Sequence, residues 1–215
     1  MNFEVIIPMK KLLIIALGLS VLASCSGPSK KQSNDSETTP ATEKAASVFS
    51  IAPNSSKVLW TAYKLSEKVG VNGTFDEVAL SGAKEAASIE ELVTGLSISI
   101  PTASVNSADP ERDVKIRKTF FTALNTDTIQ GVISSVSGTD CTVNFTLNGM
   151  TKEVKGSLKQ KENRLVWNGV LDLGDFDGKN AVDALNAVCK ERHTGKDGTS
   201  ILWPDVAIKW VVNLN

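Results

Sequence analysis

Apolar and polar residues alternate along most of the chain from residue 47 to its end. In the last such stretch, residues 206, 208, 210, 212 and 214 are all apolar, and the residues between them include Lys209 and Asn213. A period of two is typical of antiparallel strands that bury one face and expose the other. The pattern predicts eight or nine strands among residues 47–52, 57–65, 70–80, 92–100, 128–137, 140–148, 152–159, 164–172 and 205–214.

A sheet of this size in one domain closes into a barrel or splits into a sandwich. Tight-turn or bulge dipeptides, Asn72-Gly73 and Asn148-Gly149, punctuate the strands, and residues 161–163 form a hairpin loop. An eight-stranded barrel is either filled by side chains or holds one ligand. The pattern of residues does not separate these two alternatives.

Two segments have a helical pattern instead. Between Asp177 and Arg192, apolar residues recur at helical spacing, which predicts an amphipathic helix packed on the sheet. Its apolar stripe consists of Ala181, Ala184, Leu185, Val188 and Cys189.

The other helical segment is SADPERDVKIRKTFFTAL, residues 107–124. Asp109 is a good N-cap, and Pro110 suits the first helical position. Ile116, Phe120 and Leu124 form one stripe with Phe121 beside it, so one or two helical turns bury a Phe-rich face. Two i,i+4 ion pairs are expected on the exposed side, Glu111 with Lys115 and Asp113 with Arg117. Adjacent helical residues point apart, so Arg112 and Asp113 are not a paired catalytic couple; either reaches a ligand headgroup or clamps a neighbouring loop.

The N-terminal region predicts export. Lys10 and Lys11 precede LLIIALGLSVLA, a run of twelve uncharged residues that is too short to span a bilayer and fits a secretory signal. The small residues that follow and Cys25 resemble the lipobox of bacterial lipoproteins, with cleavage before Cys25 and lipidation (palmitate included) of its new N-terminus. Residues 1–24 are then a lipoprotein signal peptide, whose start is either Met1 or Met9.

Residues 26–46 contain no aromatic residue and no Val, Ile, Leu or Met. Such a segment buries too little apolar surface to fold. We therefore expect residues 25–46 to be the lipidated cysteine and a disordered tether, and residues 47–215 to be the folded domain. The formal net charge of the chain is −1, and the sequence has no basic stripe that would favour nucleic acid.

The inventory of reactive side chains disfavours an enzyme. His193 is the sole histidine and follows the predicted helix, where it suits a capping role. No zinc spacing, phosphate loop or nucleophile motif is present, so no catalytic or metal-ligating residue is expected. The acidic run Asp172–Asp177 departs from a calcium loop and is interpreted as a strand end and helix start. Cys141 and Cys189 form either one disulfide or two separate thiols.

Several short motifs in order carry a resemblance to a known family. They are Asn54-Ser55-Ser56 before a strand with Trp60, Gly73-Thr74-Phe75, Arg112-Asp113 followed by Ile116 and Phe120-Phe121, and Leu147-Asn148-Gly149-Met150-Thr151-Lys152. Together they resemble the YceI-like lipid-binding family over residues 48–214. Where that family often has histidine, this chain has Asn54, Lys115 and Asn148, so a histidine-dependent headgroup contact or metal site is not expected.

The resemblance implies an all-β fold: an antiparallel eight-stranded lipocalin-like barrel with one or two short helices and an apolar tunnel. Characterised members of the family hold a polyisoprenoid chain there and are not established enzymes. The stretch with Arg112, Asp113, Phe120 and Phe121 lies near the cavity in the family. With the aromatic residues of the predicted strands, the candidate cavity residues are Trp60, Phe75, Arg112, Asp113, Phe120, Phe121, Phe145 and Trp167.

Two functional hypotheses follow from these observations. In the first, a lipoprotein anchored through Cys25 binds or carries an amphiphilic, polyisoprenoid-like lipid in the barrel, without any other cofactor. In the second, a filled barrel without ligand is an interaction module of the envelope. Either protein is expected in the bacterial cell envelope, and Ser26 after the lipidated cysteine favours the periplasmic face of the outer membrane. The oligomeric state stays open.

Overall fold

The computed structural model describes residues 48–215. The chain divides into two units, residues 1–43 and residues 44–215, and all the described residues belong to the second. The expected signal peptide, the lipidation site at Cys25, the tether and the choice between Met1 and Met9 lie outside the described residues. No helix in the described part is long and apolar enough to cross a membrane.

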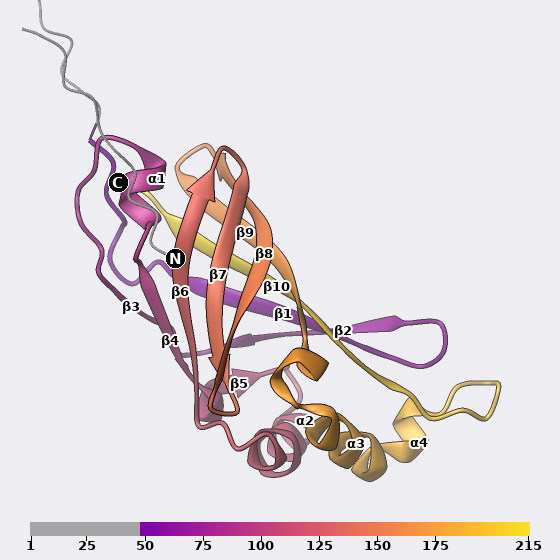
Figure 1. The fold of residues 1–215 in the computed structure, drawn as a ribbon. Coiled ribbons are helices and arrows are strands. Elements are labelled where there is room, and N and C mark those ends of the chain that lie inside the picture. Colours follow the sequence, from indigo (N-terminus) through magenta and orange to yellow (C-terminus); the bar gives the residue numbers. More distant parts are fainter. Residues whose placement is uncertain (1–47) are drawn as a thin grey trace, which may run out of the picture. The chain divides into compact units, whose positions relative to one another are not determined.

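The described residues form one antiparallel sheet of ten strands (Figure 1). The strand order is β3-β4-β6-β7-β8-β9-β10-β1-β2-β5. The strands are β1 (Lys57–Lys64), β2 (Val69–Phe75), β3 (Ala79–Ser81), β4 (Ser97–Pro101), β5 (Val105–Asn106), β6 (Thr128–Ser137), β7 (Asp140–Leu147), β8 (Met150–Lys161), β9 (Arg164–Asp172) and β10 (Leu202–Asn213).

The all-β antiparallel prediction is confirmed, but the strand count of eight is wrong. The predicted strand 70–80 is interrupted after Phe75 and becomes β2 and β3, while β5 is a two-residue strand that the alternation did not indicate. Residues 47–52 were predicted as a strand, but Phe49 and Ile51 make only isolated bridges, to Ala86 and Leu214.

The sheet is curled into a half-barrel rather than closed all round. Its edge strands are β3 and β5, and no ladder joins them within residues 48–215. The short 3₁₀ turn η1 (Thr102–Ser104) leads from β4 to β5 and crosses this seam. The backbone N–H of Asp76 donates to the carbonyl of Ser104 over 2.9 Å, which fastens the end of β2 to the turn.

The Asn72-Gly73 dipeptide lies inside β2 and makes no turn. The turn between β1 and β2 occurs earlier, with positive φ at Leu65 and Lys68. Gly73 is required for a packing reason, since a Cβ atom there would overlap the indole ring of Trp60. The prediction at Asn148-Gly149 is confirmed, because both residues have positive φ and join β7 to β8.

The helices gather mainly at one end of the half-barrel. There lie α2 (Pro110–Lys115), the π-helical turn η2 (Ile116–Phe121), the 3₁₀ turn η3 (Leu173–Phe176), α3 (Lys179–Val188) and α4 (Lys190–His193) (Figure 1). The remaining helix, α1 (Ile89–Val93), lies at the opposite end. We call these the helical end and the α1 end. The acidic run Asp172–Asp177 is a strand end and a helical turn, as expected, and Asp172 caps η3 through Gly174 N–H.

For residues 107–124, the predicted N-cap and first turn of the helix are confirmed. Asp109 caps α2 by accepting from the backbone N–H of Arg112, and Pro110 occupies the first turn. The two expected i,i+4 ion pairs do not form among the described residues. Arg112 pairs with Asp109 instead, at 3.5 Å, and Asp113 is buried.

The α1 end of the half-barrel is a packed core. The alternation of the last strand is confirmed there, because Trp210, Val212 and Leu214 are buried. Trp167 is 1% exposed and is the largest fully buried side chain. Its indole N–H donates to the carbonyl of Cys141 over 3.2 Å. Large side chains therefore fill this half of the interior.

Candidate ligand-binding cavity

The other half of the interior, toward the helical end, holds a cavity of about 130 Å³. All the side chains that line it are aliphatic or aromatic. They are Val58, Trp60, Ala62, Phe75, Ile100, Val105, Ile116, Phe120, Phe121, Leu124, Ile129, Phe145, Leu147, Leu171, Leu173, Val182, Leu185, Leu202, Trp203, Val206 and Ile208. The interior is therefore neither wholly filled nor wholly open.

The two polar groups on this wall are satisfied by the protein itself. The indole N–H of Trp60 donates to the carbonyl of Thr74 over 3.1 Å, and that of Trp203 donates to the carbonyl of Leu65 over 2.8 Å. A bound molecule would meet only hydrocarbon and aromatic surface. Such a cavity is suited to apolar groups, because a polar group placed there would have no hydrogen-bonding partner.

The Phe-rich face of the helical segment forms part of the wall. Hydrogen bonds in a π-helix join residues five apart, which brings Ile116 and Phe121 nearer to one line than an α-helix would. The ring of Phe121 lies 5.1 Å from that of Phe120 and 6.5 Å from that of Phe75, measured between centroids. The π-helical turn thus lets both phenylalanines face the cavity.

Phe145 is the floor of the cavity. It lines the empty space on one side, and on the other its ring centroid lies 5.9 Å from that of Trp167. Trp167 belongs to the packed core behind this floor and does not line the cavity.

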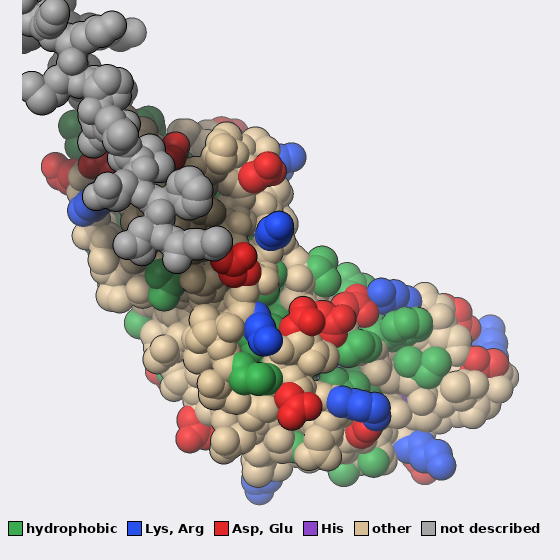
Figure 2. Space-filling model, viewed as in Figure 1, with side chains coloured by type: hydrophobic (Ala, Val, Ile, Leu, Met, Phe, Trp, Pro, Cys, Tyr) green, Lys and Arg blue, Asp and Glu red, His purple; other side chains and the backbone are tan. Residues whose placement is uncertain are grey.

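A second hollow, of about 110 Å³, adjoins the cavity and is more polar. The two share Trp60, Ala62, Ile116, Leu185 and Leu202. The remaining residues of the hollow are Tyr63, Lys64, Val71, Arg112, Lys115, Cys189, Arg192 and His193. We call this hollow the mouth. It lies where the helices meet the arm of β1, β2 and β10, along which hydrophobic and charged side chains are interspersed (Figures 1 and 2).

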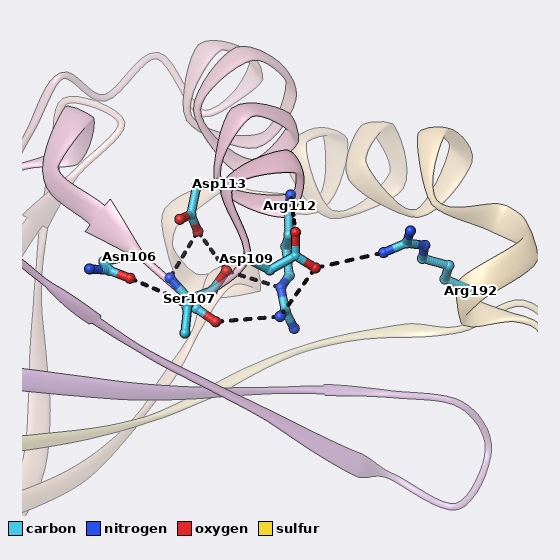
Figure 3. A network of polar contacts seen from close by, with 7 residues as sticks. Asn106, Ser107, Asp109, Arg112, Asp113 and Arg192 are labelled. Carbon is cyan, nitrogen blue, oxygen red and sulfur yellow. Dashed lines mark hydrogen bonds and ion pairs between the residues drawn. The ribbon is translucent and has the colours of Figure 1, made fainter.

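Arg112 and Asp113 both bond to Ser107, and only Arg112 also lines the mouth. Asp113 accepts hydrogen bonds from the backbone N–H of Ser107, over 2.8 Å, and from its hydroxyl, so it clamps the loop before α2 (Figure 3). Arg112 reaches the same loop through Nε, 3.0 Å from the Ser107 hydroxyl, and it also lines the mouth. Both residues therefore clamp the loop before α2, and the headgroup contact of Arg112 stays a prediction.

Asp109 joins two helices across the mouth. Its carboxylate lies 3.5 Å from Arg112 at the start of α2 and 3.8 Å from Arg192 in α4 (Figure 3). The hydrogen bond from the backbone N–H of Arg112, and then the two guanidinium charges, lower the pKa of Asp109. The carboxylate is therefore ionised at neutral pH.

His193 is buried beside the mouth rather than exposed at a helix end. Asn186 donates through Nδ2 to the carbonyl of Ser200, so its Oδ1 atom is the acceptor that lies 2.9 Å from Nδ1 of His193. The ring is therefore protonated on Nδ1. Burial and then the charge of Lys64 lower the pKa of His193, which keeps the ring neutral at pH 7.

The two cysteines are separate thiols in the structure, so the disulfide alternative is not realised. Cys141 is the second residue of β7, at the α1 end, about 20 Å along the strand from Leu147. Cys189 lines the mouth at the helical end. Burial raises the pKa of Cys141 to about 11, so this thiol stays protonated and unreactive.

Five of the eight candidate residues line the cavity: Trp60, Phe75, Phe120, Phe121 and Phe145. Arg112 lines the mouth, whereas Asp113 and Trp167 line neither space. Contact of any of them with a ligand stays a prediction. The helical stripe expected for residues 177–192 is confirmed in part, since Ala181 is buried and Leu185 lines the cavity. Val182, which was not expected, also lines the cavity, and Val188 is 51% exposed.

Sequence reasoning missed Trp203 and the cationic mouth. Trp203 precedes the expected start of the last strand at residue 205, and Pro204 hides the alternation there. The cations come from β1, α2 and α4, which are distant in sequence, so no local pattern marks them. Within residues 48–215, no three His, Cys, Asp or Glu side chains form a group that would hold a metal ion.

Comparisons with known proteins agree with this architecture. A polyisoprenoid binding domain from Saccharophagus degradans implicated in plant cell wall breakdown has a TM-score of 0.56 and 12% identity, covering 78% of this chain and 97% of its own. BcnA from Burkholderia cenocepacia has a TM-score of 0.51 and 18% identity, covering 77% of this chain and 99% of its own. Both of these chains consist almost wholly of the matching part, so in them the fold stands without a further domain.

No curated protein matches the sequence. The model of the YceI-like domain matches residues 49–210, which is most of the chain. The motifs that carried the resemblance are spread over that range, from the strand with Trp60 to the β7–β8 turn at Asn148. The chain therefore belongs to the family of proteins with a YceI-like domain.

Proposed function

We propose that this protein is a membrane-anchored lipoprotein that binds an amphiphilic lipid with a polyisoprenoid-like chain. The observation that carries the proposal is the all-apolar cavity, which ends on Phe145 and adjoins a polar mouth. A similarly folded protein is described as a polyisoprenoid binding domain. The cavity favours this function over an interaction module with a filled barrel.

Burial of apolar surface alone can provide the free energy to hold a lipid chain in the cavity without polar contacts. Burial of one CH₂ group gains about 0.8 kcal/mol, so a five-carbon isoprene unit gains about 4 kcal/mol before the costs of association. An apolar cavity of about 150 Å³ in another protein holds benzene, which is similar in size to one such unit. The 130 Å³ cavity therefore encloses about one unit as it stands. A longer chain displaces Phe120 and Leu185, which are only partly buried.

We propose a binding role rather than catalysis. Catalysis needs polar groups that converge on the bound molecule, and in the described residues the cavity wall offers none. We place the protein in the bacterial cell envelope, on the periplasmic face of the outer membrane, on account of the lipobox-like sequence before Cys25 and the Ser26 that follows it.

The domain is expected to carry lipid when it is purified from bacteria. Residues 44–215 are exported to the periplasm, purified without detergent and measured by native mass spectrometry. We expect a stoichiometric added mass that is released on denaturation and identified by lipid extraction. A folded domain that carries no lipid and takes up no added farnesol would favour the interaction module instead.

Anchoring is tested separately on the full chain. Cys25→Ala is expected to move the protein from the membrane fraction to the soluble fraction, because the variant lacks the sulfur to which the lipid is attached. Cys189→Ala serves as the control and should stay with the membrane. If Cys25→Ala remains membrane-bound after an alkaline wash, the lipoprotein assignment fails, while the cavity and its ligand are unaffected.

A further inference from the structure

The cavity ends partway along five strands of the half-barrel. On each of them, the inward residues toward the helical end line the cavity, whereas those toward the α1 end are buried without lining it. The last lining residues before the α1 end are Ile100 in β4, Ile129 in β6, Phe145 in β7, Leu171 in β9 and Ile208 in β10. The next buried apolar side chains on these strands are Ile98, Ile133, Val143, Trp167 and Trp210. Side chains therefore close the cavity toward the α1 end.

Trp167 fills the interior directly behind this boundary. Gly156 in β8 and Gly169 in β9 pair with each other, and neither has a side chain to fill the space inside the sheet. The indole of Trp167 covers both, since a Cβ atom would lie 2.6 Å from its Cε2 atom at Gly156 and 2.6 Å from its Cζ2 atom at Gly169. On its other side, Gly169 pairs with Ile208, which lines the cavity. Without the indole, the space over the two glycines would continue the cavity toward the α1 end.

The contacts of this ring make it a firm stop. Its N–H donates to the carbonyl of Cys141, and the ring of Phe145 packs on it from the side of the cavity. A fully buried ring whose N–H is bonded yields less readily to a ligand than Phe120 and Leu185, which are only partly buried. A chain that enters therefore widens the cavity near the mouth and not at its floor.

The lining residues of β10 measure the length that is available to a chain. They run from Leu202, which also lines the mouth, to Ile208, six residues further or about 20 Å along the strand. A fully extended chain advances about 1.2 Å per bond, as the polypeptide backbone does, so about 16 bonds or four isoprene units cover this length. Because the 130 Å³ cavity encloses only about one unit before it widens, four units are an upper limit.

We propose that Trp167, with Phe145 in front of it, sets the maximum length of the bound chain. The ligand is then a short-chain amphiphile with at most about four isoprene units inside the cavity. This inference rests on the proposed lipid-binding function and specifies the chain-length class of the ligand. Carbon atoms beyond the limit stay at the mouth in contact with water, so they add nothing to the affinity.

A series of prenyl alcohols that share one headgroup tests the limit. Geraniol, farnesol, geranylgeraniol and geranylfarnesol contain from two to five isoprene units. They are titrated into residues 25–215 carrying Cys25→Ala, stripped of lipid, with each alcohol below the concentration at which it aggregates. Each enclosed CH₂ group should tighten binding about fourfold. The affinity should therefore rise with length and stop rising at geranylgeraniol or earlier, and geranylfarnesol should match geranylgeraniol within about twofold.

Trp167→Ala should move this limit. The indole that it removes is larger than benzene, which a cavity of about 150 Å³ in another protein holds, so about one more isoprene unit fits. The longest alcohol that still gains affinity should become one unit longer, with a gain of at least about tenfold for that unit. If this variant does not fold, Trp167→Leu should move the limit in the same direction.

Leu165→Ala is the matched control for a loss of stability. Leu165 is fully buried on the same face of β9, two residues further from the cavity, and its truncation also leaves a hollow in the core. Because Trp167 still separates this hollow from the cavity, the length limit should not change. Chain-length selectivity thus distinguishes the stop from a residue that only stabilises the fold.

The outcomes separate this inference from the proposed function. An affinity that rises another tenfold from geranylgeraniol to geranylfarnesol in the chain with Trp167 overturns the length limit and leaves lipid binding intact. A limit that stays the same in a folded Trp167 variant, or that moves equally in Leu165→Ala, overturns the role of Trp167. If none of the alcohols binds the folded chain, the lipid-binding function itself fails.

Discussion

Ala62→Phe is expected to abolish lipid uptake without unfolding the domain. Ala62 lies in β1 at the junction of the cavity and the mouth, and its side chain lines both. A benzyl group there would occupy the space through which a chain passes. If the ring keeps four methylene groups of the lipid chain out of the cavity, about 3 kcal/mol of binding free energy is lost, which weakens binding about 200-fold.

The stability of this variant should change little. The new ring fills existing space, so it does not force the close-packed α1 end of the core apart. The matched control is Ala207→Phe in β10. Ala207 pairs with Thr61, the neighbour of Ala62, and lines neither the cavity nor the mouth.

The affinity of both variants for farnesol is measured by titration, and their stability by thermal unfolding. Ala207→Phe should bind like the unmodified domain. If Ala62→Phe still takes up farnesol with unchanged affinity while it remains folded, the ligand does not lie in this cavity, and the proposed function loses the observation that carries it.

Trp167→Ala is expected to cause the largest loss of stability in the domain. The ring is fully buried between the glycines of β8 and β9, and its indole N–H is bonded to Cys141. Truncation of a buried aromatic residue to alanine costs about 3–5 kcal/mol. For a chain of this size that corresponds to a fall in Tm of roughly 6–20 °C. Val170→Ala on the same strand is exposed and should change the stability by less than about 0.5 kcal/mol.

A double-mutant cycle with Gly169 tests the reason for this loss. A Cβ atom at Gly169 would lie 2.6 Å from Cζ2 of Trp167, so Gly169→Ala alone should destabilise the domain by about 1–3 kcal/mol. In the Trp167→Ala background the same change should cost almost nothing, because the ring that it meets is gone. Additive effects in chemical denaturation would show that the ring does not pack against Gly169.

The sequence was sufficient to predict the bounds of strands that have a clear alternation of apolar and polar residues. β6 and β9 have the predicted bounds, and β1 and β7 each end one residue early. Periodicity predicts these strands well because one face is buried along their whole length. It fails for β5, which has two residues, and for the break between β2 and β3, since neither is long enough to show a period.

The candidate site was predicted in part for a similar reason. Aromatic residues on strands with a known inner face, such as Trp60 and Phe145, were assigned to the interior correctly. Their depth along the strand was not predictable, so Trp167, which is in the packed core, was grouped with residues of the cavity wall. Depth depends on how the sheet curls, and the curl follows from pairings between residues as distant as Leu59 and Lys209.

The floor made by Phe145 and Trp167 has a consequence for how the proposed lipid enters and leaves the cavity. A cavity that is closed at one end admits and releases its ligand through the same opening. The lipid that we propose must therefore enter tail first and leave head first, with its headgroup at the mouth. Entry and release then follow the same path in opposite directions. The donor and the acceptor of the lipid, and not the cavity, therefore set the direction of net transfer.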